Sequence, residues 1–113
     1  MDENRIWQSL TVSGAKGSKR VKALVDSGAT ITAISESLAD EIGAKITGKE
    51  IIETIGEENV PALTGLVKVK IKGRTTPLEV VIIKGCKEMV IGSDFLQKTD
   101  GYVDYKEDKL RLP

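Results

Sequence analysis

The stretch Ala23-Leu24-Val25-Asp26-Ser27-Gly28-Ala29-Thr30 decides how the rest of this sequence is interpreted. Three apolar residues predict a buried strand, and a carboxylate, a hydroxyl and a glycine follow where that strand should end. Apolar residues resume at once with Ile31. A carboxylate between apolar runs is costly unless it is hydrogen-bonded or shares a proton. The cost points to a functional Asp26, while the structural alternative is a turn aspartate that caps the next backbone amides.

Length and charge narrow the possible partners. The 113 residues predict a single domain over 1–113. The 17 Lys and Arg residues balance the 17 Asp and Glu residues, so no basic excess predicts a nucleic acid partner or an anionic membrane surface. No apolar run reaches the ~18 residues of a membrane span. The polar start shows no signal peptide, so we expect a reducing, cytoplasmic location and no membrane association.

Missing residue types narrow the chemistry. The sequence has no His, which excludes Ser-His-Asp and Cys-His nucleophile systems and imidazole metal sites. Cys86 is the single cysteine, so neither an internal disulfide nor a thiolate zinc cluster can form. We interpret Cys86 as a bystander in a turn rather than as a reactive thiolate. The chemistry left is that of carboxylates, and we expect no metal and no organic cofactor.

Short strands separated by polar turns dominate the predicted elements. The predicted strands are Ile6–Val12, Arg20–Val25, Thr32–Ile34, Lys49–Ile55, Val60–Ile71, Thr75–Ile83, Glu88–Ile91, Gly101–Asp104 and Lys109–Leu112. Lys68, Lys70 and Lys72 alternate with apolar residues and predict a solvated strand face. Two short helices are predicted, Ser35–Ile42 capped by Ser35 and Ser93–Lys98 capped by Ser93 or Asp94. The pattern predicts a mainly β fold, with a closed barrel or a folded sheet.

One carboxylate cannot easily act as both acid and base. Two carboxylates that face each other can, because like charges at close range share one proton and take separate roles. The chain has one Asp-Ser-Gly triplet, so the second must come from another chain. A two-fold homodimer supplies it, since a residue on the axis meets its own copy.

Two segments resemble one known family. Asp26-Ser27-Gly28-Ala29 resembles the Asp-Thr/Ser-Gly-Ala signature of retropepsin-like (retroviral-type) aspartic proteases. The segment Met89–Leu96 resembles that family's apolar-apolar-Gly element, which leads into a short helix. The resemblance runs from about Ile6 to Leu112 and is strongest to the cellular, non-viral branch, which includes the protease domain of DNA-damage-inducible ubiquitin-shuttle proteins. It implies a homodimeric closed barrel that hydrolyses peptide bonds.

The resemblance implies a role for each residue of the signature. Asp26 would be the catalytic carboxylate, paired with Asp26 of the other subunit around one water. Ser27 would support the active-site loop by a hydrogen bond across the dimer axis, together with Gly28. The residues implied to contact an extended peptide are Gly28, Ala29, Thr30, Ile55 and Gly56. The last two belong to a flap tip over residues 54–59.

The sequence also departs from the family pattern. Glu57 and Glu58 make the flap acidic and poor in glycine. Many viral members carry an acidic residue where Thr30 stands and an Arg where Ser93 stands, so an ion pair between these positions cannot support this dimer. The departures leave a second function open, a dimeric module that binds extended peptides or assembles partners with weak or no catalysis.

A different class of enzymes has a similar sequence motif. Asp-Ser-Gly-Ala-Thr also resembles the phosphate-binding loop of sugar kinases and actin-like ATPases. That fold needs two large domains and a second phosphate loop, and 113 residues cannot hold them. Asp94, the other carboxylate near an apolar strand, is interpreted as a helix N-cap rather than as a catalyst. Carboxylate chemistry at Asp26 therefore remains the leading hypothesis.

Overall fold

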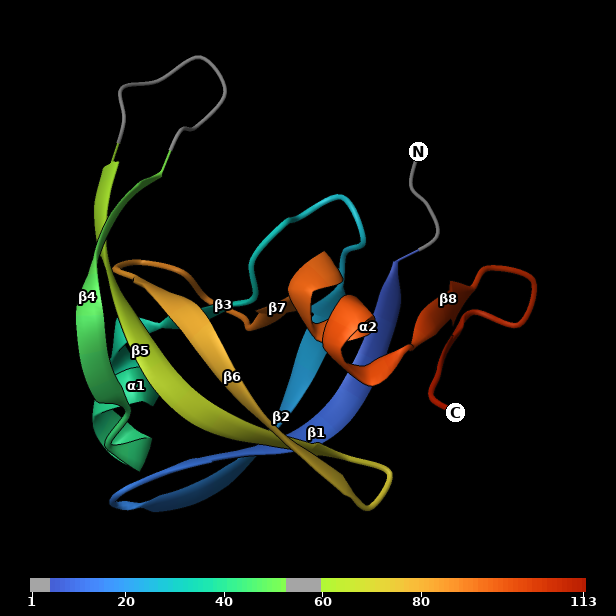
Figure 1. Cartoon of the computed structure of the whole chain (residues 1–113), viewed down its shortest axis with the longest axis horizontal. Coiled ribbons are helices and arrows are strands. Elements are labelled where there is room, and N and C mark those ends of the chain that lie inside the picture. The colour runs from blue at the N-terminus through green and yellow to red at the C-terminus, as the bar shows by residue number, and fades with distance from the viewer. Residues whose placement is uncertain (1–4, 53–59) are drawn as a thin grey trace.

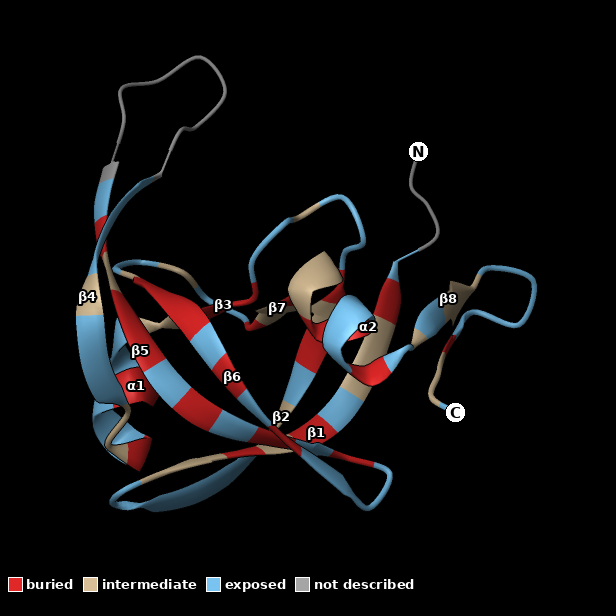
Figure 2. Cartoon of the chain, viewed as in Figure 1, coloured by how far each residue is buried: buried red, intermediate tan, exposed pale blue. Residues whose placement is uncertain are grey.

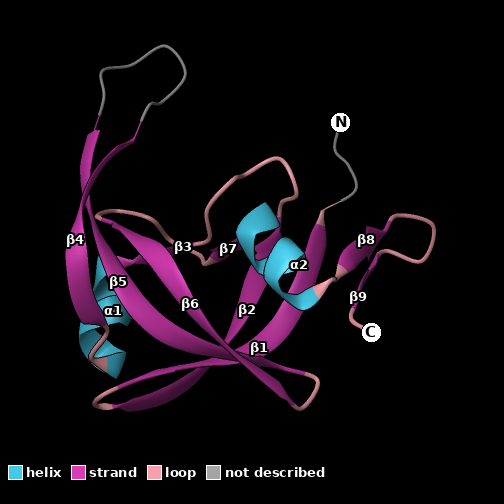
Figure 3. Cartoon of the chain, viewed as in Figure 1, coloured by secondary structure: helices cyan, strands magenta, loops and turns pink. Residues whose placement is uncertain are grey.

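The structure is a computed structural model that describes residues 5–52 and 60–113 (Figure 1). The strands are β1 (Ile6–Gly14), β2 (Gly17–Val25), β3 (Ala33–Ser35), β4 (Lys45–Ile52), β5 (Val60–Ile71), β6 (Arg74–Ile83), β7 (Val90–Ile91), β8 (Tyr102–Asp104) and β9 (Lys109–Arg111). The helices are α1 (Glu36–Ile42) and α2 (Ser93–Thr99). The predicted mainly β fold with two short helices is confirmed (Figure 3).

Six strands close a barrel within the described residues. Neighbouring strands follow the order β1-β2-β7-β3-β6-β5, and β5 pairs back onto β1 through Thr11–Ser13 and Lys68–Lys70. Closure leaves β4 outside the ring, hydrogen-bonded to β5. The two strands β8 and β9 form a separate small sheet. The closed barrel predicted from the sequence is therefore confirmed.

One loop of this barrel crosses the end of a neighbouring strand, next to the candidate site. The strand β7 lies between β2, to which it is parallel, and β3, to which it is antiparallel. Because β2 and β3 are successive in the chain, their connection over residues 26–32 must pass across the end of β7. Figure 1 shows this connection as a cyan loop beside α2. The crossing brings the two motifs of the sequence into contact.

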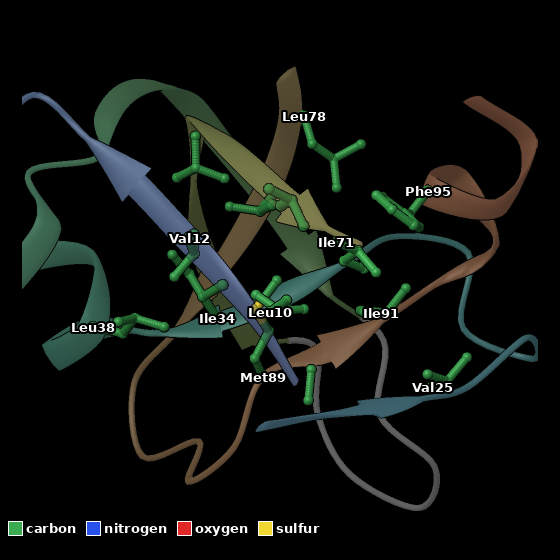
Figure 4. Packing of buried hydrophobic residues seen from close by; sticks show 14 of the residues in the cluster. Leu10, Val12, Val25, Ile34, Leu38, Ile71, Leu78, Met89, Ile91 and Phe95 are labelled. Atoms are coloured by element: carbon green, nitrogen blue, oxygen red, sulfur yellow. The ribbon is translucent and has the colours of Figure 1, made fainter. Parts of the chain in front are cut away.

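The core fills the inside of the barrel. Its fully buried side chains include Leu10, Val12, Ile34, Ile71, Ile91 and Phe95, and Figure 4 shows several of them converging from different elements. Burial alternates along β5 and β6 (Figure 2). Lys68, Lys70 and Lys72 are exposed while the apolar residues between them are buried, so the predicted solvated face is confirmed.

The helix ends confirm one predicted cap and correct the other. Ser35 Oγ accepts a hydrogen bond from the Leu38 N–H at 3.1 Å, as predicted for the first helix. At α2 the N-cap position is Gly92, which has no side chain to accept a capping hydrogen bond. The prediction of Ser93 or Asp94 as the cap was wrong, because both residues already lie inside the helix. Neither helix in the described ranges is long and apolar enough to cross a membrane.

Several strand boundaries differ from the prediction, and those of β4, β7 and β3 lie near the candidate site. The strand β4 begins at Lys45 rather than Lys49, because Lys45 already pairs with Leu66, and a register shift between Ile46 and Gly48 hides the pattern in the sequence. The strand β7 has only two residues, Val90–Ile91, rather than Glu88–Ile91. The third strand runs over Ala33–Ser35 instead of Thr32–Ile34. The predicted strand end at Ile55 lies outside the described residues.

Candidate active site

Asp26 is placed by the strand pair β2 and β7. Its backbone N–H donates to the carbonyl oxygen of Ile91 at 2.9 Å, which continues the parallel ladder one residue beyond β2. The side chain is exposed in the single chain. The apolar run before Asp26 therefore ends in a carboxylate that is fixed at its backbone and open to solvent.

The loop after Asp26 is a tight turn. Asp26 Oδ1 accepts a hydrogen bond from the Gly28 N–H at 3.0 Å, and the Asp26 carbonyl oxygen accepts one from the Ala29 N–H at 3.0 Å. The structural alternative for Asp26, a turn aspartate that caps the next amides, thus describes part of the geometry. The carboxylate is exposed, so the burial cost expected from the sequence is absent in the single chain, and the carboxylate stays accessible beside the turn.

Gly92 lets the loop lie directly on the start of α2. The Ser93 N–H donates to the Ala29 carbonyl oxygen at 2.7 Å. A Cβ atom on Gly92 would lie 2.8 Å from that same oxygen and 2.9 Å from the carbonyl carbon of Ile31. Both neighbours are backbone atoms, so no side chain could turn away to make room. The apolar-apolar-Gly element therefore supports the Asp26 loop by direct contact with its backbone.

Thr32 and Asp94 close the other end of the loop. The Thr32 N–H and Oγ1 both donate to the Asp94 carboxylate, at 3.0 Å to Oδ2 and 2.8 Å to Oδ1 respectively. Thr32 Oγ1 in turn accepts from the Gly92 N–H at 3.0 Å. Thr32 is fully buried. Sequence reasoning missed this pair, because Asp94 near a helix start looks like a cap and the crossing of β7 was not foreseen.

Ser27 has a partner that the sequence did not reveal. Its Oγ lies 3.1 Å from the Oη of Tyr105, in the turn between β8 and β9. Both residues are exposed in the single chain. Within one chain the Ser27 hydroxyl therefore contacts the C-terminal hairpin, while its hydrogen bond across a dimer axis stays a prediction. A separation of 78 positions gives no local signal for the Tyr105 contact.

A cleft opens beside the loop. It encloses about 920 Å³ and is lined by Gly28, Ala29, Thr30, Ile31, Ala33, Glu50, Ile51, Val81, Ile83 and Val90. The predicted substrate-contact residues Gly28, Ala29 and Thr30 are among them. The other two predicted contacts, Ile55 and Gly56, lie outside the described residues. Sequence reasoning missed Glu50 and Ile51, although both lie in the predicted strand Lys49–Ile55, because the pairing of this strand with β5, which brings it to the cleft, has no local signal.

Two titratable groups outside the cleft have shifted pKa values. Burial raises the pKa of the Cys86 thiol, which donates a hydrogen bond to the Glu88 carbonyl oxygen at 3.0 Å. A raised pKa disfavours the thiolate, consistent with Cys86 as a bystander. The N–H of Glu107 holds the pKa of Asp104 below its usual value, with help from Arg111. In the part of the chain that is described, no three His, Cys, Asp or Glu side chains gather as a metal ion would require.

Comparison of the sequence with known proteins shows the family of this chain. A family model described as "gag-polyprotein putative aspartyl protease" matches residues 12–98. Two proteins named DNA damage-inducible protein 1 are similar. The one from Eremothecium gossypii is 29% identical over 96% of this chain, and the one from Candida glabrata is 31% identical over 81%. The chain covers 23% and 22% of these relatives, or about a quarter of their length.

Solved structures share the fold at low sequence identity. The retroviral protease-like domain of Ddi1 from Leishmania major has a TM-score of 0.70 and 19% identity, covering 98% of this chain and 90% of that one. A retropepsin-like aspartic protease from Rickettsia conorii has a TM-score of 0.62 and 19% identity, covering 99% and 96%. With the Asp26 loop resting on the Gly92 element and the family model spanning both, the chain belongs to the retropepsin-like aspartyl protease family, close to the protease domain of Ddi1.

Proposed function

We propose that this chain is a homodimeric aspartic endopeptidase. Two subunits would bring their Asp26 carboxylates together on a two-fold axis, and one water between them would be activated for peptide hydrolysis. The observation that carries the proposal is the placement of Asp26. Its backbone is fixed by Ile91, its carboxylate is exposed, and the next residues line an open cleft.

The need for a dimer follows from the acid and base roles. In aspartic proteases generally, two carboxylates share one proton, because like charges so close cannot both ionise. Each chain here supplies one Asp-Ser-Gly triplet. Exposure of both Asp26 and Ser27 in the single chain leaves this surface open to a partner. A two-fold axis near Asp26 supplies the second carboxylate from the same sequence.

The proposed reaction needs no covalent intermediate. The ionised Asp26 takes a proton from the water as its oxygen attacks the scissile carbonyl carbon. The protonated Asp26 gives its proton to the carbonyl oxygen. Collapse of this tetrahedral species breaks the C–N bond as a proton passes to the leaving nitrogen. Proton transfers by groups placed in this way typically contribute about 10²–10⁴-fold.

The substrate class follows from the cleft and the sheet edge. Most of the described lining residues are apolar or small, which suits apolar side chains. Among the described strands β4 is the last in its sheet, so its outer edge can pair with an extended peptide. Extended, mostly apolar peptide segments are therefore the proposed substrates. The proposal includes no cofactor. Because a single cysteine cannot form an internal disulfide, the proposed location is the reducing cytoplasm.

The Asp26→Asn variant tests this function. The native chain should cleave a mixture of unfolded protein substrates at acidic or neutral pH, and Asp26→Asn should lose cleavage while sedimentation still shows a dimer. Asp40→Asn, a matched change at an exposed residue of α1, should cleave like the native chain. If the native dimer binds peptides but does not cleave them at any pH, its function is that of a peptide-binding module and not of an enzyme. Cleavage that persists in Asp26→Asn would reject Asp26 as the catalyst.

A further inference from the structure

The described lining of the cleft includes one carboxylate. Among the described residues that line the cleft, Glu50 carries a charge, and the other nine are apolar, glycine or threonine. Glu50 is exposed in the single chain. The family signature assigns no role to this position, which lies far from Asp26 in the sequence. The question is whether the Glu50 side chain points into the cleft or away from it.

The strand register answers this question. Val81 on β6 lies opposite Thr64 on β5, so their side chains share a face of the sheet. Ala62 is two residues from Thr64 on β5 and therefore has the same face. Glu50 on β4 lies opposite Ala62. The Glu50 side chain is thus on the face of Val81, which lines the cleft.

The alternate residues confirm the assignment. Lys49 precedes Glu50 and lies opposite Leu63, which pairs with Ile82. These three residues line a different pocket on the other face of the sheet. Ile83, two residues after Val81, lines the cleft again. The Lys49 side chain therefore points away from the cleft, and the Glu50 side chain points toward it.

A peptide in the cleft would cover Glu50 with whatever side chain faces it. An apolar side chain would remove water from a charge without replacing its hydrogen bonds, and an acidic one would repel it. A Lys or Arg side chain could lay its aliphatic stem along the apolar lining and bring its charge to the carboxylate. The neighbouring Ile31, which also lines the cleft, offers such apolar surface, being 41% exposed.

We infer that Glu50 is a specificity-determining residue that selects a basic side chain in an otherwise apolar peptide. The inference rests on the proposed function for its use in proteolysis, although the selection itself is a binding property. In a two-fold dimer the cleft has two copies of Glu50. A basic residue on either side of the scissile bond would then be recognised.

Peptide binding tests the inference separately from cleavage. A set of peptides with one apolar centre carries Lys, Gln or Glu at each flanking position in turn, and affinity is measured by fluorescence anisotropy with the Asp26→Asn protein. At one or more positions, Lys should bind about three- to tenfold more tightly than Glu. The preference should disappear in Asp26→Asn/Glu50→Gln and reverse in Asp26→Asn/Glu50→Lys. It should also weaken as salt is added.

The control is Glu88→Gln in the same background, because Glu88 is exposed and lines a different pocket. It should keep the preference for Lys. Equal binding of Lys and Glu peptides at every position, or a preference that survives Glu50→Gln, would overturn the inference. The proposed function has its own readout, which is cleavage of the Gln peptides by the native chain. A preference for Lys peptides without any cleavage would reject the proposed protease function but keep the role of Glu50. Cleavage without a preference for Lys peptides would reject the role of Glu50 but keep the protease function.

Discussion

The carboxylate of Asp94 accepts hydrogen bonds from both donors of Thr32, although 62 positions separate the two residues. The Thr32 hydroxyl also accepts from the N–H of Gly92, so one side chain joins the end of the Asp26 loop to the first turn of α2. Asp94 Oδ1 further accepts from the Phe95 N–H at 2.7 Å. The loop that carries Asp26 is therefore held at both ends by β7 and the residues that follow it.

Thr32→Val should destabilise the fold. Valine keeps the shape of threonine but removes the hydroxyl, which leaves the buried Gly92 N–H without its acceptor and Asp94 without one donor. An unsatisfied buried group of this kind costs about 1–3 kcal/mol. The free energy of unfolding from urea titration should fall by that amount. Thr32→Ser, which keeps the hydroxyl, should lose less.

Thr75→Val provides the matched control for that measurement. Thr75 lies on β6 and is exposed, so the same chemical change there should shift the free energy of unfolding by under about 0.5 kcal/mol. Equal losses at Thr32 and Thr75 would show that the Thr32–Asp94 contact contributes nothing specific. They would then reflect only the replacement of a hydroxyl by a methyl group.

Gly92→Ala should displace the Asp26 loop. The backbone angles at Gly92, φ −97° and ψ −177°, suit any residue, so the effect is steric alone. The added Cβ would meet backbone atoms of Ala29 and Ile31 at 2.8–3.0 Å. Overpacking of this kind costs about 1–3 kcal/mol, and the proposed peptide cleavage should fall with it. In Gly48→Ala, the control, the Cβ meets the Thr64 side-chain hydroxyl at 3.3 Å, so the loss should be smaller.

Tyr105→Phe should affect catalysis more than stability. The variant removes the hydroxyl that lies 3.1 Å from Ser27 Oγ, at an exposed site where one hydrogen bond adds about 1 kcal/mol or less. Because Ser27 adjoins Asp26, we expect kcat for peptide cleavage to fall about two- to tenfold with little change in KM. Tyr102→Phe is the control, since Tyr102 is similarly exposed on β8. Identical kinetics for the two variants would argue against a positioning role for Tyr105.

Most strands and the helix ends could be predicted from the sequence because the information for them is local, whereas closure of the barrel was implied by the family resemblance. Alternation along Val67–Ile71 has a period of two, and Ser35 and Gly43 carry the signals of a helix start and a helix end. The loop of Asp26 could also be placed, since an apolar strand precedes it and an Asp-Ser-Gly turn has few conformations. Each of these features depends on neighbours within a few positions of the chain.

The contacts that hold the site could not be predicted in the same way. Thr32 with Asp94 and Ser27 with Tyr105 are separated by 62 and 78 positions, and each contact depends on the tertiary arrangement rather than on a pattern. Asp94 shows how local reasoning fails: a carboxylate at a helix start predicts a cap, but two donors of Thr32 compete for it. Glu50 was missed for a related reason, because its place in the cleft depends on the pairing of β4 with β5 rather than on a local pattern.

Acid should loosen the hairpin that carries Tyr105. The Glu107 N–H and then Arg111 stabilise the ionised Asp104, so the pKa of Asp104 lies below its usual value of about 3.9. A lowered pKa in the folded chain means that the stabilisation is complete above the usual value and is lost as pH falls through the lowered one. NMR of the Asp104 carboxyl carbon should show a midpoint below about 3.9. A midpoint at or above the usual value would contradict the Glu107 contact in solution.

Dilution should inactivate the proposed enzyme, because a shared site exists only in the dimer. Specific cleavage activity should stay constant at high concentration and fall once the chain is diluted below the dimer dissociation constant, which sedimentation measures independently. Mixing the native chain with an excess of Asp26→Asn should have a related effect, since mixed dimers hold one competent carboxylate and one amide. Activity should then fall faster than the native fraction itself. Activity per native chain that stays constant on dilution and on mixing would place the whole catalytic site within one chain.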